Sequence, residues 1–305
     1  MKKILITGHE GLVGSHLMVQ LKKAGYLPVG LDIEAKNNDF KGNVIDRDRL
    51  KLAMQGCVGI VHLAAVSRVV WGENNPDLCW QTNAEASKQL ITLALESDHQ
   101  PWVMVSSSRE VYGESVALPV TEDAELKPVN VYGRAKLAME EATQFARKQG
   151  LQTSIVRLAN VYGSIDDHAD RVLPAFCRAA VLGEVLRVDG MDHTFDFTHI
   201  SDTVDGLMRV IDKLDSGEMN LPPIHFLPGL PTTLGEAAYF AIQAANSSST
   251  IQEAPSRSYD VARFVGDATR AKTLLGWEAK ITPEQGIALL VNKFQLSVNK
   301  EKVVA

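Results

Sequence analysis

The first 160 residues alternate short apolar runs with stretches whose apolar residues recur at helical spacing. The apolar runs predict buried strands at 4–6, 29–32, 59–63, 102–105 and 154–158. The amphipathic stretches predict helices at 12–24, 76–96 and 130–149. Continuous apolar strands that alternate with helices are typical of a parallel sheet covered on both faces. We therefore predict an α/β fold in residues 1–160, a Rossmann-type doubly wound parallel sheet that binds a dinucleotide.

After about residue 160 the pattern is less regular. Helices are predicted at 170–183, 201–214, 232–246, 267–275 and 283–296, with short extended pieces between them. Residues 161–305 are therefore expected to form mainly a smaller C-terminal lobe that binds the substrate. Whether some of these segments return to the first sheet stays open at this point.

Composition narrows the class of protein. With 45% hydrophobic and 22% charged residues, the chain is globular rather than disordered or fibrous. Its 31 basic and 37 acidic residues give a net charge of −6, so nucleic acid is not an expected partner. Cys57, Cys79 and Cys177 are far apart, and the histidines show no ligand spacing, so we expect no metal and a reducing compartment. No apolar run is long enough for a leader or a membrane span, which predicts a cytoplasmic protein without membrane partners.

A glycine-rich turn lies between the first strand and the first helix. Gly8, Gly11 and Gly14 permit a tight turn, a close approach of a pyrophosphate and close helix packing, and the helix N-terminus attracts anions. Asp32 ends the second strand, where a carboxylate accepts hydrogen bonds from ribose hydroxyls and repels a 2′-phosphate. This context favours NAD over NADP. The plain alternative is an ordinary turn and a surface aspartate.

A phenol and an ammonium are four residues apart on the predicted helix 130–149. At that spacing Tyr132 and Lys136 share one face of the helix. Because a cation favours the phenolate, Lys136 and an oxidised nicotinamide are expected to lower the pKa of Tyr132 from about 10 toward neutrality. Tyr132 would then be a general base for a hydroxyl proton. The hydroxyls at 106–108 end a predicted strand, where one could hydrogen-bond to the reacting oxygen. The alternatives are a helix-surface pair and a polar strand end.

The order and spacing of these residues resemble the nucleotide-sugar epimerase/dehydratase branch of the extended short-chain dehydrogenase/reductase superfamily. The resemblance runs from Thr7 to about Gly286 and includes the segments 62–65, 106–113, 157–163, 196–202 and 274–277. It implies an enzyme that uses NAD to oxidise C4 of a nucleotide-diphosphate sugar to a transient 4-keto intermediate and then returns the hydride. Epimerisation, loss of water and loss of carbon dioxide all stay open as outcomes.

The resemblance also assigns roles to individual positions. It places at the cofactor Gly8, Gly11, Leu12, Val13, Gly14, Asp32, Asn43, Val44, Leu63, Ala64, Ala65, Asn83, Tyr132 and Lys136. Asn43 stands where the family usually has an aspartate beside adenine, and its amide oxygen could still accept from the adenine amino group. The resemblance assigns catalysis to Ser108, Tyr132, Lys136 and Glu110, and substrate contacts to Ser108, Asn160 and Arg257. Arg187, near Phe195 in the sequence, is a further candidate for the substrate diphosphate, and the alternative for either arginine is a solvated surface side chain.

Two positions distinguish outcomes within this family. Glutamate at the position of Glu110 acts at or beside C5 in dehydratases and decarboxylases, whereas 4-epimerases commonly have a small residue there. The alternative is a surface ion pair with Arg109. Phe195 replaces an arginine that commonly binds the substrate diphosphate. Two other functions stay open. One is a keto-sugar reductase that releases its cofactor in every cycle. The other is a non-catalytic NAD-binding relative, and Phe195 favours only this second alternative.

The helices 76–96 and 130–149 predict a homodimer through a four-helix bundle, as in relatives of this type. The first of them has apolar residues beyond what one sheet face requires, namely Leu90, Ile91, Leu93, Ala94 and Leu95. The alternative is a helix fully covered by the core of a monomer.

Overall fold

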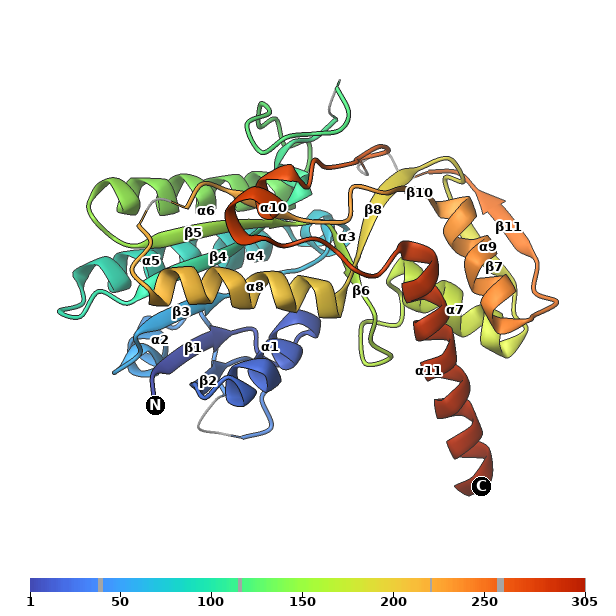
Figure 1. The fold of residues 1–305 in the computed structure, drawn as a ribbon, viewed down its shortest axis with the longest axis horizontal. Helices are drawn as coiled ribbons and strands as arrows, with labels where there is room; N and C mark the ends of the chain where they lie inside the picture. The colour runs from blue at the N-terminus through green and yellow to red at the C-terminus, as the bar shows by residue number, and fades with distance from the viewer. Residues whose placement is uncertain (38–40, 115–116, 220, 257–260, 305) are drawn as a thin grey trace.

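The computed structural model describes residues 1–37, 41–114, 117–219, 221–256 and 261–304. The chain folds into a larger lobe around a parallel sheet, with a smaller lobe of short strands and helices beside one end of it (Figure 1). Within the described ranges, no helix combines the length and the apolar character needed to cross a membrane.

The sheet of the larger lobe confirms the predicted fold class. Its strands are β1 (Lys3–Thr7), β2 (Leu27–Leu31), β3 (Gly59–His62), β4 (Trp102–Ser108), β5 (Thr153–Leu158) and β9 (Ile224–Phe226). They lie in the order β2-β1-β3-β4-β5-β9, and every neighbouring pair is parallel. The chain passes from β1 outward to β2 and then back across to β3 on the other side. This reversal creates a switch point at the carboxyl ends of β1 and β3, where open α/β sheets bind ligands.

Helices cover both faces of this sheet. One face packs against α1 (Leu12–Lys23), α8 (Ile200–Asp215) and α10 (Thr269–Leu275). The other face packs against α2 (Arg47–Met54), α5 (Ala86–Glu96) and α6 (Val131–Lys148). The expected helix 76–96 is α4 (Pro76–Trp80) joined to α5 through a π-helical turn at Gln81–Glu85. The short helix α3 (Val69–Asn74) and the 3₁₀ turn Arg109–Val111 complete this lobe.

The smaller lobe consists of short strands and three helices around a separate apolar core. A three-stranded sheet contains β6 (Asn160–Tyr162), β8 (Thr194–His199) and β10 (Pro231–Thr233), and a parallel pair contains β7 (Leu186–Asp189) and β11 (Ile251–Ala254). The helices are α7 (Val172–Leu182), α9 (Leu234–Ala245) and α11 (Pro283–Val304). The five helices predicted after residue 160 therefore all form. Among the elements after residue 160, β9, α8 and α10 pack on the larger lobe rather than in the smaller one.

Candidate active site

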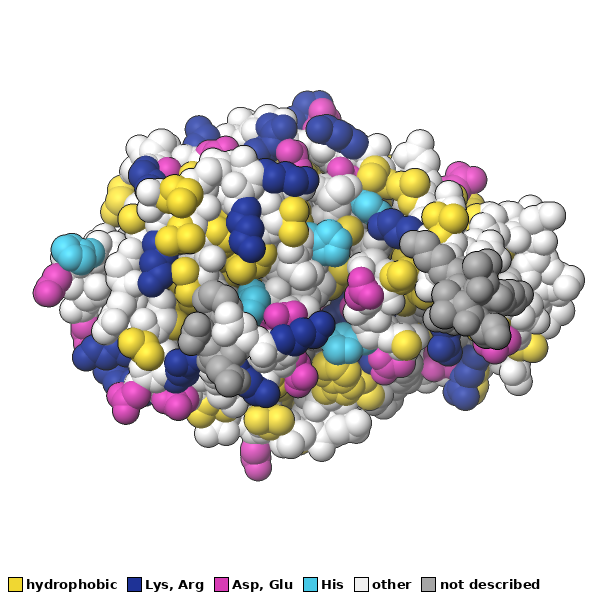
Figure 2. All heavy atoms as spheres, turned by 90° about the horizontal axis from the view of Figure 1, so that it is seen from below, with side chains coloured by type: hydrophobic (Ala, Val, Ile, Leu, Met, Phe, Trp, Pro, Cys, Tyr) yellow, Lys and Arg dark blue, Asp and Glu magenta, His cyan; other side chains and the backbone are white. Residues whose placement is uncertain are grey.

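A cavity of about 870 Å³ lies at the switch point of the sheet, between the two lobes. Acidic, basic and histidine side chains gather near the middle of the face shown in Figure 2, where the lobes meet. The predicted residues that line the cavity are Gly8, Gly11, Leu12, Val13, Gly14, Asp32, Asn43, Val44, Leu63, Ala64, Ala65, Ser108, Glu110, Tyr132, Lys136, Asn160 and Arg187. The fold thus brings most of the predicted set to one place.

Two positions of the glycine turn at one end of the cavity, Gly8 and Gly14, leave no room for a side chain. Gly8 has φ +73°, and a Cβ atom on it would lie 2.7 Å from the backbone nitrogen of Ala64. A Cβ atom on Gly14 would lie 2.2 Å from the carbonyl oxygen of Gly8. Gly11 is the N-cap of α1 and has no side chain to cover the first-turn N–H groups. This bare turn before a helix N-terminus fits a pyrophosphate.

Asp32 and Asn43 lie at the same end of the cavity, after β2. The Asp32 carboxylate accepts the backbone N–H groups of Glu10 at 3.0 Å and Glu34 at 2.9 Å, which orient it at the cavity wall. The amide oxygen of Asn43 accepts the N–H of Ile45 at 3.0 Å. One lone pair of that oxygen is therefore already used within the chain. The acceptor at Asp32 fits a ribose, and the residues of this end together fit NAD.

One predicted contact, Asn83, does not line the cavity, and another, Arg257, is not among the described residues. Asn83 lies behind the wall, where its amide accepts the N–H of Val66 at 2.8 Å and donates to the Val66 carbonyl at 3.0 Å. It therefore holds the segment after β3 in place rather than lining the cavity. Arg257 lies outside the residues that the structure describes.

The other end of the cavity holds the hydroxyls and the amine. Ser108 ends β4, and Tyr132 and Lys136 lie on the first turns of α6. The Lys136 Nζ atom donates to the Ser106 carbonyl at 2.8 Å and lies 5.8 Å from the centre of the Tyr132 ring. The sheet edge and one helix thus bring a serine, a tyrosine and a lysine together, which suits proton transfer at an alcohol or ketone.

Residues 4–221 match the model of the NAD dependent epimerase/dehydratase family. The chain belongs to this family. It is 28% identical over 320 residues to UDP-glucuronic acid decarboxylase 5 of Arabidopsis thaliana, covering 98% of this chain and 91% of that one. It is also 28% identical over 313 residues to UDP-glucose 4-epimerase of Mycolicibacterium smegmatis, covering 96% and 98%. The solved structure of UDP-glucose 4-epimerase with UDP-glucose from Thermotoga maritima has a TM-score of 0.89 and 25% identity, covering 97% and 99%.

The pKa of Tyr132 in the chain by itself is set mainly by burial. Burial raises the pKa of Tyr132 to about 12, against the lowering effect of a hydrogen bond with the Ser108 hydroxyl. Desolvation outweighs the lowering effects of the Ser108 hydrogen bond and of the Arg171 charge. The expected fall requires a bound oxidised nicotinamide beside Lys136 and stays a prediction. Burial also lowers the pKa of Lys136 to about 8. In both cases the poorly hydrated site disfavours the charged form of the side chain, which is why the pKa of the tyrosine rises and that of the lysine falls.

Glu110 is held in the cavity wall by two side chains. It is 5% exposed, and its Oε1 atom pairs with Arg109 Nη2 at 2.9 Å. Its Oε2 atom accepts from Asn130 Nδ2 at 2.8 Å. The predicted pair with Arg109 therefore exists, but it is buried at the cavity rather than on the surface. A carboxylate with both oxygens engaged has a defined position.

Sequence reasoning missed Asn130 and the environment of Arg109. Asn130 caps α6 by accepting the N–H of Gly133 at 2.8 Å, so one residue both starts the catalytic helix and orients Glu110. An asparagine directly before a predicted helix was the available signal. Arg109 lies over the ring of Phe195, 4.5 Å from its centre, and nothing in the sequence pattern pointed to this contact.

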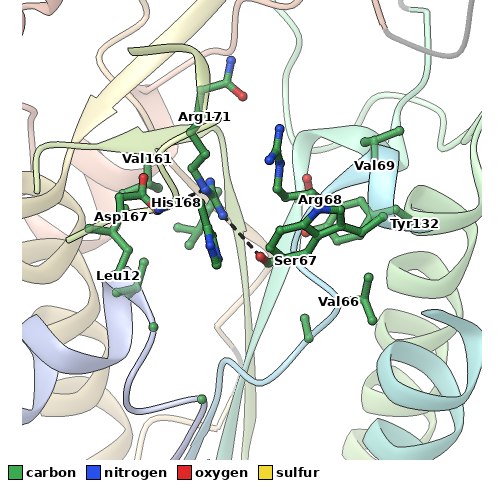
Figure 3. Close-up of a pocket in the computed structure, with 18 of the residues that line it drawn as sticks. Leu12, Val66, Ser67, Arg68, Val69, Tyr132, Val161, Asp167, His168 and Arg171 are labelled. Carbon is green, nitrogen blue, oxygen red and sulfur yellow. Dashed lines mark hydrogen bonds and ion pairs between the residues drawn. The ribbon is translucent and has the colours of Figure 1, made fainter. Parts of the chain in front are cut away.

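Segments from the two lobes also meet across the cavity. Figure 3 shows Arg171, after β6, reaching toward Ser67, after β3, and their side chains are 3.3 Å apart. Arg68 forms an ion pair with Asp170 and donates to its carbonyl at 3.2 Å. These contacts span the space between the segments that follow β3 and β6. The charged run at 166–171 was the sequence signal that the prediction did not use.

Proposed function

We propose that this protein uses NAD to oxidise C4 of a nucleotide-diphosphate sugar transiently and returns the hydride before releasing product. The observation that supports this proposal most directly is a single cavity whose two ends are lined by different kinds of residue. The glycine turn and Asp32 line one end, and Ser108, Tyr132 and Lys136 line the other. Its membership of the NAD-dependent epimerase/dehydratase family supports the same reaction class.

In this proposal, the cofactor lies along the carboxyl ends of β1, β2 and β3. The glycine turn holds the pyrophosphate, with the backbone of Leu12 and Val13, and Asp32 holds the adenosine ribose. Asn43 and Val44 flank the adenine. The remaining contacts come from Leu63, Ala64, Ala65, Tyr132 and Lys136. When bound, NAD supplies the hydride acceptor and donor.

The residues at the other end move protons. Tyr132 takes the proton of the C4 hydroxyl, and the Ser108 hydroxyl hydrogen-bonds to the same oxygen. Because burial raises the pKa of Tyr132 to about 12, the phenolate needs added positive charge. Lys136 lies within reach to supply one charge, with its ammonium 5.8 Å from the ring centre. Lys136 also binds the nicotinamide ribose in this proposal.

Glu110 directs the outcome after C4 is oxidised. A ketone at C4 makes the proton on C5 acidic, and a carboxylate in reach can remove it. Both oxygens of Glu110 are already hydrogen-bonded, so its position is set before substrate enters. This supports dehydration over plain epimerisation. In decarboxylation no proton leaves C5: the C5–C6 bond breaks, its electron pair passes to C5 and the C4 ketone, and C5 takes up a proton from water beside Glu110. The relatives of this chain include both UDP-glucuronic acid decarboxylases and UDP-glucose 4-epimerases.

The substrate enters beside the smaller lobe. Asn160 and Arg187 line the cavity and are the proposed contacts to the nucleotide diphosphate. The Arg187 side chain is 70% exposed and paired with Asp189 at 2.8 Å. A solvated, paired arginine contributes little binding energy, so Arg187 acts at the rim of the site.

We also propose a homodimer in the cytoplasm. Four of the five residues that motivated the dimer are buried in the core of their own chain, namely Leu90, Ile91, Leu93 and Ala94. Leu95 is partly buried against the same core, so the five leave little for a partner. Trp80 on α4 and Phe145 on α6 are 41% and 65% exposed, and they are the apolar side chains offered to a second copy. Light scattering at micromolar concentration should give twice the chain mass, and Phe145→Glu should give the monomer. A monomeric wild-type protein would exclude the dimer.

One experiment tests the reaction. The protein is purified, its bound NAD is measured, and it is incubated with UDP-glucose, UDP-glucuronate, dTDP-glucose and GDP-mannose. Mass spectrometry and NMR of the products should show a 4-epimer or loss of water or carbon dioxide, without net consumption of NAD. Tyr132→Phe should give no product while it still binds NAD. Consumption of NADH with keto-sugars would indicate a reductase instead, and no turnover of any sugar would remove the proposal.

A further inference from the structure

Arg109 is buried in the wall of the cavity, and one of its terminal nitrogen atoms has no hydrogen-bond partner among the described residues. It is 9% exposed and lines the cavity. Its Nη2 atom pairs with Glu110 at 2.9 Å, and its Nε atom donates to the Asn160 amide oxygen at 3.4 Å. Its Nη1 atom is buried and has no hydrogen-bond partner among the described residues.

Two aromatic rings hold the guanidinium group in position. Its central carbon lies 4.5 Å from the centre of the Phe195 ring and 5.8 Å from the centre of the Phe264 ring. Phe195 lines the cavity from β8, and Phe264 lies in the core behind it. Cation–π attraction to the two rings restrains the guanidinium group. The group is therefore fixed before any ligand arrives.

The position of Glu110 does not depend on Arg109 alone. The second carboxylate oxygen is held by Asn130 at 2.8 Å. The ion pair can therefore persist while Nη1 contacts another group. A buried N–H without a partner is energetically costly, and a ligand acceptor at Nη1 would offset that cost.

We propose that Arg109 binds an oxyanion of the nucleotide-sugar substrate through its free Nη1 group. The inference rests on the proposed function and adds a specificity residue to that site. A guanidinium in a poorly hydrated wall prefers a charged oxygen, since such hydrogen bonds are about twice as strong as neutral ones. The oxyanion is either a phosphate of the diphosphate or a carboxylate on the sugar. Both sources present the same acceptor chemistry.

The competing role is a positioning one, in which Arg109 only holds Glu110. The two roles separate in a cycle of Arg109→Gln, Glu110→Gln and the double variant, with binding measured by calorimetry on the NAD-loaded protein. A substrate contact predicts that Arg109→Gln weakens binding about 10- to 100-fold in both backgrounds. No added effect of Arg109→Gln in the Glu110→Gln background would overturn the proposal. The double variant removes both charges together and so leaves no unpaired buried ion.

The choice of ligands identifies the oxyanion. Calorimetry compares UDP, UDP-glucose and UDP-glucuronate. Equal losses for all three place the contact on a phosphate, and a loss confined to UDP-glucuronate places it on the sugar carboxylate. Arg178→Gln on the exposed side of α7 removes the same charge away from the cavity and should leave all three affinities unchanged. A wild-type protein that binds NAD but none of the three would refute the proposed function, whereas wild-type binding that Arg109→Gln does not weaken would refute only this inference.

Discussion

Arg157 and Glu140 form a bidentate ion pair inside the larger lobe, between β5 and α6. Arg157 Nε lies 2.9 Å from Glu140 Oε1, and Arg157 Nη2 lies 2.6 Å from Oε2. Arg157 Nη1 also donates to the Tyr112 hydroxyl at 2.7 Å. The partnership raises the pKa of Arg157, so the guanidinium stays charged. Because Glu140 lies one turn after Lys136, the pair ties the catalytic helix to the sheet.

Glu140→Gln should destabilise the protein strongly. The change leaves a buried guanidinium without its counter-charge, and breaking such a pair costs about 3–5 kcal/mol. Urea denaturation measures the loss in the free energy of unfolding. The matched control is Asp205→Asn on α8, whose partner Arg209 lies four residues away on the same helix and is partly exposed. That change should cost about 0–1 kcal/mol, and equal costs for the two variants would contradict the argument.

Lys136→Met should make the protein more stable and inactive. Burial lowers the pKa of Lys136 to about 8, so at neutral pH the folded state holds an ammonium that the unfolded state holds more favourably. Removing it should raise the free energy of unfolding by about 1–3 kcal/mol at pH 7.

The increase in the free energy of unfolding caused by Lys136→Met should shrink as pH rises from about 8 to about 10.5. In this range Lys136 of the wild type is protonated in the unfolded state but not in the folded state. The stability of the wild type therefore rises relative to the variant across this window. Denaturation curves at several pH values measure the difference between the two proteins. A difference that does not change with pH would show that Lys136 is not desolvated.

Asp32→Ala should weaken NAD binding and reduce the discrimination against NADP. The carboxylate is the proposed ribose acceptor and the charge that repels a 2′-phosphate, so its removal should cost roughly 10- to 100-fold in NAD affinity. Asp32→Asn is the matched variant, since its amide oxygen can still accept from Glu10 or Glu34. Fluorescence titration gives both affinities. Equal losses for NAD and NADP would remove Asp32 from cofactor selection.

Glu110→Gln distinguishes the possible reactions. The amide keeps the shape of the side chain and its contact with Asn130 but cannot remove a proton from C5. If turnover is dehydration, the rate should fall roughly 10²–10⁴-fold while NAD binding and C4 oxidation survive. If the protein is a plain 4-epimerase, the rate should stay within a few-fold. Product analysis in deuterated water adds a second readout, because unchanged turnover without deuterium at C5 would exclude Glu110 from the mechanism.

The sequence by itself determined the fold class, the main strands and helices, and a predicted site of which most residues line the cavity. The period of apolar residues predicted the sheet and the helices, since that period records which side of each element faces a core. Gly8, Gly14 and Asp32 were identifiable because a turn that excludes Cβ atoms and the end of a strand are local features. The serine, the tyrosine and the lysine were recognised from their spacing along one strand end and one helix.

Only the tertiary structure decided what surrounds each of those residues. The pKa of Tyr132 rises because α6 is buried against the sheet, and a spacing of four residues contains no information on burial. Arg109 meets Phe195 through the approach of β8 to β4, eighty-six positions apart in the chain. Asn83 hydrogen-bonds to the backbone of Val66, 17 positions earlier, rather than facing the cavity, and this contact too depends on how two segments pack. Desolvation and long-range contacts depend on how distant segments pack, and packing has no local signature in the order of residues.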